Sequence, residues 1–126
     1  MLPRQHRLTS RREIKKLYSS GKTHVHRLLV LKVQRTGDAL PSLFAFSTSS
    51  ALGKAVARNR AKRLFREAVR LLGSRVEQHG YNVMLIARPP AREATFAEVS
   101  CAVEELFRKA GLLGPAGSEP TDLSTR

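Results

Sequence analysis

The sequence predicts an α+β fold, a two-layer sandwich in which helices pack on a small sheet in the order α-β-β-α-β-α. Three stretches have apolar residues at helical spacing, and three short runs are rich in β-branched residues and leucine. Residues 43–87 run strand, helix, strand, a crossover connection that predicts parallel pairing in part of the sheet. A chain of 126 residues suits one domain. We expect that domain to span 1–113 and the Pro- and Gly-rich tail 114–126 to be disordered.

The two outer helices are predicted from their start and stop signals. The first begins at Ser10-x-x-Glu13, a capping box whose side chains bond free N–H groups at a helix start, and ends at Gly21. Its apolar face comprises Ile14, Leu17 and Tyr18. The last helix begins at a second box, Thr95-x-x-Glu98, and ends at Gly111. Its predicted buried side comprises Phe96, Val99, Val103, Leu106, Phe107 and Ala110.

The strands are predicted from short apolar runs bounded by turn residues. Residues 27–34 (RLLVLKVQ) and 43–48 (LFAFST) are separated by a turn signal, which favours an antiparallel hairpin. Phe44 and Phe46 share a face, because strand side chains alternate. Residues 81–87 (YNVMLIA) are nearly all apolar and predict a central strand buried on both faces. A short run around 24–26 is compatible with an extra strand.

The charge of the chain is its strongest functional signal. There are 23 Lys and Arg against 10 Asp and Glu, a net charge of +13. So small a domain repels itself unless a polyanion supplies counter-charge, which favours a nucleic-acid partner over a charge that serves solubility alone. A membrane surface is less well supported, because no basic helix carries the broad apolar face of an interfacial helix.

The cysteine count, the lack of targeting signals and the lack of catalytic motifs narrow the possible classes of function. Cys101 is the only cysteine, so it has no internal disulfide partner and no zinc site, which fits a reducing compartment. The basic N-terminus lacks the apolar stretch of a secretory signal, and no run approaches a membrane span. We therefore expect a cytoplasmic protein. No acid pair, Ser/His/Asp set, Cys/His nucleophile or HExxH motif is present, so no catalytic residue is predicted in the protein itself.

The predicted helix at 55–72 carries most of the argument for function. Between positions 58 and 70 it has six Lys or Arg and one acid, Glu67. Guanidinium groups match phosphate oxygens in bidentate geometry, and helical spacing repeats them along a nucleic-acid backbone. A merely solvated helix would mix Glu with its Lys at i, i+4. One stripe of the helix holds Asn59, Arg63, Arg66 and Arg70, with Arg58 and Lys62 beside it. The opposite side, expected to face the sheet, holds Ala57, Ala61, Leu64, Ala68, Leu71 and Leu72.

Several other side chains have two readings each. Tyr18 is a candidate either for nucleic-acid contact or for the core beside Ile14. Phe44 and Phe46 share a face, so one or both are candidates for the core. His24-x-His26 offers two metal ligands without a third nearby, and surface histidines are the better-supported reading. We therefore predict no metal site in the protein.

The basic helix is also the most specific sign of a family. Arg58-Asn59-Arg60, followed by Ala61-Lys62-Arg63 and Arg66-Glu67, resembles the signature of the bacterial ribonuclease P protein family. The resemblance covers roughly residues 4–113. Supporting segments are Arg7-Leu8, Gly21-Lys22, Phe46-Ser47, Leu52-Gly53-Lys54-Ala55-Val56, Tyr81-Asn82-Val83, Ala87-Arg88-Pro89 and Arg108-Lys109-Ala110-Gly111-Leu112-Leu113.

The resemblance implies a fold and an activity. The fold is like that of the second domain of ribosomal protein S5, with a left-handed crossover where general topology rules favour a right-handed one. In that family an RNA subunit catalyses removal of the 5′ leader from precursor tRNA. The protein assists by binding the leader and by raising substrate and Mg²⁺ affinity. The implied partners are the catalytic RNA and precursor tRNA, with no membrane and no obligatory protein partner. The protein binds no cofactor of its own, and Mg²⁺ is held by the RNA.

The resemblance also implies the site residues. RNA binding falls on Lys54, Arg58, Asn59, Arg60, Lys62, Arg63, Arg66 and Arg70. The cleft for the 5′ leader, between the first helix and the sheet, falls on Ile14, Tyr18, Lys32 and Phe46. Aromatic stacking on unpaired bases is the usual physics of such a cleft. Two of these positions depart from the family, since Ile14 replaces a usual Phe and Lys32 a frequent aromatic residue.

Three other functions share some of these features. A ribosomal or other structural RNA-binding protein has the charge and the fold but no need of a cleft lined by Tyr18 and Phe46. A DNA-binding or nucleoid protein would read bases with polar side chains in the major groove, whereas this helix is almost all Arg and Lys. A stand-alone nuclease would cleave without any RNA, and no residues predict one.

Overall fold

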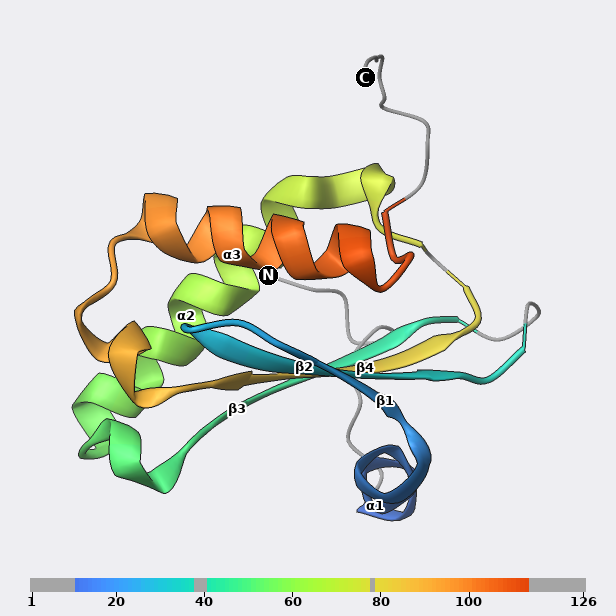
Figure 1. Ribbon diagram of the computed structural model, residues 1–126, viewed down its shortest axis with the longest axis horizontal. Helices are drawn as coiled ribbons and strands as arrows, with labels where there is room; N and C mark the ends of the chain where they lie inside the picture. The colour runs from blue at the N-terminus through green and yellow to red at the C-terminus, as the bar shows by residue number, and fades with distance from the viewer. Residues whose placement is uncertain (1–10, 38–40, 78, 114–126) are drawn as a thin grey trace.

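The computed structural model describes residues 11–37, 41–77 and 79–113 (Figure 1). Its main elements are α1 (Arg11–Ser20), β1 (Lys22–Val25), β2 (Leu29–Arg35), β3 (Leu43–Thr48), α2 (Ala55–Leu72), β4 (Tyr81–Ala87) and α3 (Phe96–Lys109). Short 3₁₀ segments, η2 (Ser50–Leu52), η3 (Gly73–Arg75) and η4 (Pro89–Glu93), lie between them. The predicted order of elements is confirmed, with β1 as the extra strand. No helix in these ranges is long and apolar enough to cross a membrane.

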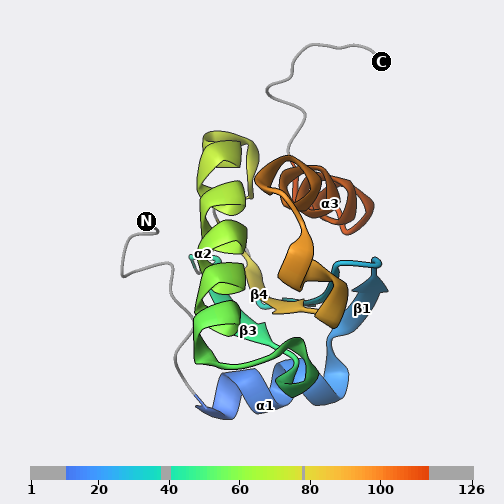
Figure 2. The ribbon, with the colours of Figure 1, turned by 90° about the vertical axis from the view of Figure 1, so that its left-hand side faces the viewer.

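The four strands form one mixed sheet in the order β1-β2-β4-β3. β2 pairs antiparallel with both β1 and β4, while β3 and β4 run parallel, with Phe44 opposite Val83. Part of the sheet is therefore parallel, as the crossover predicted. The prediction that β2 and β3 form an antiparallel hairpin is wrong, because β4 lies between these two strands. Viewed with α2 in front of the sheet and β3 pointing up, β4 lies to the left of β3, so the β3-α2-β4 connection is left-handed (Figures 1 and 2).

The two faces of the sheet are covered unequally. α2 and α3 lie on one face, and α1 lies alone on the other (Figure 2). Because strand side chains alternate, β4 divides its residues between the faces. Val83, Leu85 and Ala87 join the core under α2 and α3, and Asn82, Met84 and Ile86 point toward α1. A central strand buried on both faces is confirmed.

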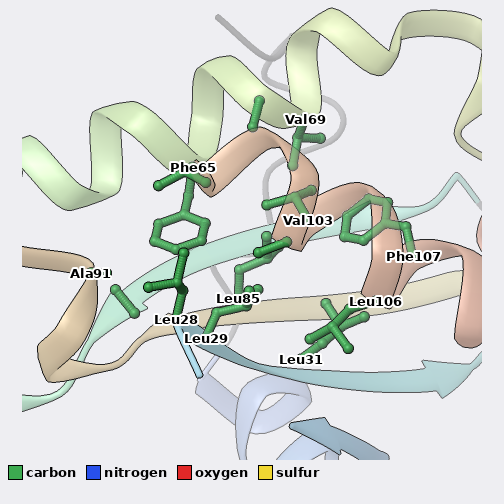
Figure 3. Close-up of a cluster of buried hydrophobic side chains, with 14 of the residues drawn as sticks. Leu28, Leu29, Leu31, Phe65, Val69, Leu85, Ala91, Val103, Leu106 and Phe107 are labelled. Carbon is green, nitrogen blue, oxygen red and sulfur yellow. The ribbon is translucent and has the colours of Figure 1, made fainter. Parts of the chain in front are cut away.

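The main core fills the layer between the sheet and the two long helices (Figure 3). Phe65 of α2 and Phe107 of α3 are almost fully buried. The ring of Phe107 stacks on Phe44 of β3, with centroids 6.5 Å apart. Burial of each such side chain stabilises the fold by about 1.5–3 kcal/mol. The face under α1 has a much smaller core of Leu17 and Met84, with Ile14, Leu43, Ala45 and Ile86 packed against it.

The buried side of α2 differs from the predicted one. Its buried residues are Ala61, Phe65, Ala68, Val69 and Leu72. Leu71, predicted to face the sheet, is 57% exposed, so that prediction is wrong. Leu71 lies about 120° around the helix from Phe65, the largest buried residue of the helix. Apolar residues occupy more than half of the helix circumference, and only packing against α3 and the sheet decides which of them are covered.

Of the two predicted capping boxes, only the one at Thr95 lies within the described residues. At the start of α3, Thr95 Oγ1 accepts the Glu98 N–H at 3.2 Å, and the Thr95 N–H donates to Glu98 Oε1 at 2.8 Å, as predicted. The box at Ser10 lies outside the described residues. At the other end of α1, the Gly21 N–H donates to Leu17 O at 2.9 Å, and a Cβ at Gly21 would lie 2.6 Å from that oxygen. Only glycine therefore fits at position 21, at the predicted end of α1.

Candidate nucleic-acid interface

The basic side chains of α2 form a row along its exposed side. Asn59 and Arg63 are exposed, and Arg58, Lys62 and Arg66 are half-buried. In the described part of the chain, none of the four cations in this row forms an ion pair with an acid. A helix also carries partial positive charge at its N-terminus, close to Lys54 and Arg58. This side of α2 is therefore a strongly electropositive strip.

Arg70, at the far end of the predicted row, is neutralised within the protein. Its Nε donates to Glu67 Oε2 at 3.0 Å, and its Nη2 donates to Glu67 Oε1. These side-chain bonds lower the pKa of the Glu67 carboxyl below its ordinary value and raise the pKa of the Arg70 guanidinium. Arg70 thus contributes less to the electropositive strip than Arg63, its unpaired neighbour on the same stripe.

Arg60, which the family resemblance assigns to RNA binding, is bound to the backbone of the protein itself. Its Nη1 donates to Arg92 O and its Nη2 to Ala94 O, both at 3.0 Å. Two carbonyls of the η4–α3 junction are thereby satisfied by one guanidinium. The fork geometry of Arg matches two nearby carbonyls as well as it matches a phosphate.

Phe46 lies on the face opposite the one predicted for it. It packs against the core under α2 and α3, on the same face as Phe44. The guanidinium of Arg66 lies over its ring, 5.8 Å from the centroid. Its assignment to a cleft between α1 and the sheet is therefore wrong. Strand alternation, which places Phe46 with Phe44, decides its face. The aromatic ring supports a cation of the α2 row instead.

The other three predicted cleft residues do lie together on the α1 face. Ile14 is half-buried and packs against the Leu17–Met84 cluster. Tyr18 is 48% exposed, so its assignment to the core is wrong. Lys32 Nζ lies 5.4 Å from the centroid of the Tyr18 ring and donates to Thr23 Oγ1 at 3.1 Å. An exposed aromatic ring and a cation thus stand side by side on this face, a pairing suited to single-stranded nucleic acid.

A polar pocket adjoins this cleft and was missed by the sequence analysis. It has a volume of about 560 Å³ and is lined by Glu13, Lys16, Gln34, Arg35, Thr36, Pro41, Leu43 and Asn82. Gln34 follows Lys32 by two residues on β2, so the two share a face. Among the described residues, Gln34 Oε1 and Thr36 Oγ1 are buried without a hydrogen-bond partner. The only sequence signal was the polar Asn82 within an otherwise apolar strand.

The outer side of the molecule, on α3, has its charges compensated. Glu104 Oε2 accepts from Arg75 Nη2 at 3.3 Å and from Arg108 Nη2 at 2.7 Å. Glu105 Oε2 accepts from Lys109 Nζ at 3.3 Å. These pairs contrast with the uncompensated cations of α2. The charges at this end of α3 are therefore largely balanced within the protein.

The predicted histidine pair has a structural contact. His26 Nδ1 accepts the Leu28 N–H at 3.0 Å, and its Nε2 lies 4.0 Å from Glu105 Oε1. His24 is half-buried on β1. Within residues 11–37, 41–77 and 79–113, no three His, Cys, Asp or Glu side chains are grouped closely enough to hold a metal ion.

Comparison with known proteins gives one consistent result. The family model described as Ribonuclease P matches residues 2–111. The chain is 43% identical over 116 residues to the ribonuclease P protein component of Symbiobacterium thermophilum, covering 92% of this chain and all of that one. It is 38% identical over 106 residues to that of Caldanaerobacter subterraneus, covering 84% of this chain and 90% of the relative.

Solved structures show the same fold. The RNase P protein of Staphylococcus aureus superposes with a TM-score of 0.75 at 24% identity, covering 86% of this chain and 98% of that one. The RNase P protein of Thermotoga maritima superposes with a TM-score of 0.71 at 25% identity, covering 82% and 98%. The fold and the matched sequence agree, and the chain belongs to the ribonuclease P protein family, whose members are the protein component of the tRNA-processing ribonucleoprotein enzyme.

Proposed function

We propose that this protein binds the catalytic RNA of ribonuclease P through α2 and binds the single-stranded 5′ leader of precursor tRNA in the cleft beside α1. The observation that carries the proposal is the cationic row of Arg58, Lys62, Arg63 and Arg66, which form no ion pair with any described residue, on a helix that contains one acid. A helix with this spacing of cations follows a phosphate backbone, and its affinity comes from released counterions.

The leader assignment is supported by the opposite face of the sheet. Tyr18 and Lys32 are in contact there, next to the polar pocket that contains Gln34 and Asn82. An aromatic ring stacks on unpaired bases of any sequence, and a neighbouring cation contacts the backbone. Two RNA-binding faces on opposite sides of one sheet would let the protein hold a substrate against the catalytic RNA.

The catalytic role of the protein would be electrostatic. By placing cations between two polyanions, it lowers their repulsion and raises the affinity of the complex for substrate and for Mg²⁺. The Mg²⁺ ions belong to the RNA and to the substrate in this proposal, and the protein contributes no ligand set. Chelation by EDTA should then abolish cleavage by the assembled enzyme and leave the melting temperature of the isolated protein unchanged.

A cleavage assay tests the proposal. The full chain, a bacterial ribonuclease P RNA and precursor tRNA are mixed at low, near-physiological Mg²⁺, beside controls with protein alone and RNA alone. Efficient release of the 5′ leader is expected only from the mixture. The variant Arg63→Ala should weaken this enhancement, and Arg108→Ala on the compensated α3 should not. Binding of RNA without any enhancement of cleavage would instead favour a structural RNA-binding protein.

A further inference from the structure

A basic pocket lies at the start of α2, before the first cation of the row. It has a volume of about 670 Å³ and is lined by Ser50, Gly53, Lys54, Val56, Ala57, Arg60 and Arg92. Three of these lining residues are cations and none is an acid. Arg92 comes from η4, 38 positions after Lys54, so the fold brings together charges that no local sequence pattern connects.

The three cations of this pocket have different tasks. The guanidinium of Arg60 is bound to two backbone carbonyls, Arg92 O and Ala94 O. Arg60 therefore holds η4 against α2. The side chains of Lys54 and Arg92 make no ion pair within the described residues and are exposed. They are the two cations of the pocket that remain available to a ligand.

The end of the Arg92 side chain lies next to Gly53. A Cβ built on Gly53 would lie 2.9 Å from Arg92 Nη1, closer than any real Cβ contact. Gly53 also has φ +141°, a conformation that side chains disfavour. A side chain at position 53 would therefore displace the flexible end of Arg92, which lines the same pocket as Lys54.

We propose that Lys54 and Arg92 bind a phosphate of the RNA that docks along α2, so that the RNA-binding surface continues past the start of the helix onto η4. The proposal rests on the proposed function and extends it to Arg92, a residue outside the basic helix. Lys54 and Arg58 are four positions apart, and the Arg58 N–H bonds Lys54 O at 3.0 Å. A backbone that passes Arg58 therefore reaches Lys54 next.

Binding of RNA by two matched variants tests the proposal. Arg92→Gln and Arg108→Gln each remove one exposed positive charge, but Arg108 is bound to Glu104 on α3. The dissociation constant of the full chain for a bacterial ribonuclease P RNA transcript is measured over a series of monovalent salt concentrations. Arg92→Gln should weaken binding about threefold to fivefold at low salt, as expected for one exposed ion pair. It should also lower the slope of log K against log salt by about 0.7–0.9, the value for one phosphate contact. Arg108→Gln should change neither quantity measurably.

Two further titrations make the outcomes distinguishable. Equal weakening by both variants, or none by Arg92→Gln, overturns the proposal, since a general charge effect would then suffice. A single-stranded leader oligonucleotide should bind wild type and Arg92→Gln alike, and weakening confined to that oligonucleotide would assign Arg92 to the wrong RNA. If Arg63→Gln weakens binding of the transcript while Arg92→Gln does not, only this inference fails. If neither does, the docking of RNA on α2 fails as well. The melting temperature of Arg92→Gln should equal that of wild type, because the Arg92 side chain forms no ion pair with any described residue.

Discussion

Asn82 Nδ2 donates a hydrogen bond to Glu13 Oε1 at 3.1 Å and so joins the central strand to a helix 69 positions earlier. Asn82 is 3% exposed, and its amide is a polar group in a strand of otherwise apolar and aromatic side chains. The bond fixes α1 beside the polar pocket that both residues line. α1 rests on a small core, so a single buried polar contact matters more for its position than it would for α2 or α3.

Loss of this contact should destabilise the fold measurably. Glu13→Ala leaves the buried Asn82 amide without its acceptor, which costs about 1–3 kcal/mol in the free energy of unfolding. Glu13→Gln keeps an oxygen at the same place and should cost much less. Urea unfolding followed by circular dichroism compares the two variants. Equal losses would show that the charge of Glu13, and not its bond to Asn82, stabilises the protein.

Arg60 and Arg63 should respond differently to the same conservative change. Arg60→Lys removes the fork that satisfies Arg92 O and Ala94 O, and lysine cannot donate to both carbonyls in the same geometry. The free energy of unfolding should fall by about 1–3 kcal/mol. Arg63→Lys, which alters an exposed side chain without a protein partner in the described residues, should leave stability unchanged. Thermal unfolding of both variants measures the difference. An Arg60→Lys variant as stable as wild type would contradict a positioning role for Arg60.

Substitutions at Tyr18 and Phe46 should affect different properties, the first leader affinity and the second the stability of the fold. Tyr18→Leu removes an exposed ring, and stacking of one base on such a ring contributes about 1–3 kcal/mol to binding. Fluorescence anisotropy with a single-stranded leader oligonucleotide should therefore detect weaker binding at nearly unchanged stability. Phe46→Leu shortens a side chain packed on the main core and should lower stability while leaving leader affinity within about twofold. A large loss of leader affinity in Phe46→Leu would show that Phe46 contacts the leader after all.

The start of α3 should give the protein part of its acid sensitivity. The backbone N–H of Thr95 lowers the pKa of the Glu98 carboxyl below its ordinary value of 4.5. A carboxyl with a lowered pKa in the folded state stabilises the fold fully above its unfolded-state pKa, and this contribution is lost as the pH falls through the folded-state value. Glu98→Gln should therefore unfold with a weaker pH dependence below about pH 4.5 than wild type. Urea unfolding at neutral pH and in the acid range provides the comparison. The same acid dependence in both proteins would exclude a contribution from Glu98.

The elements of the fold could be predicted because their signals are local. The second capping box, the apolar run of β4 and the periodicity of α2 each depend on residues within a few positions of one another. Strand order is not local. The turn between β2 and β3 indicates a hairpin, yet β4 inserts between them, and only the complete set of buried faces decides that arrangement. The hand of the crossover was available from the family resemblance and from nothing in the residues themselves.

The candidate site was predictable to the extent that neighbouring residues determine it. The pairing of Arg70 with Glu67 follows from i, i+3 spacing and could have been read from the sequence. The partners of Arg60 could not, since they are carbonyls 32 and 34 positions away. The face of Phe46 was implied by its alternation with the buried Phe44, and the family assignment overrode that signal. Arg92 was missed because the pocket it lines includes Lys54, 38 positions earlier in the chain.

The division of β4 between two faces has a mechanical consequence. Val83 and Leu85 support α2 from one side of the strand, while Met84 supports α1 from the other. The sheet therefore sets the distance between α1 on one face and α2 on the other. Each of these faces carries a separate group of cations. Substitutions in β4 that alter side-chain volume would move the two helices apart or together without touching any charged residue. The spacing between the two proposed RNA-binding faces would therefore depend on the volume of the apolar side chains of β4.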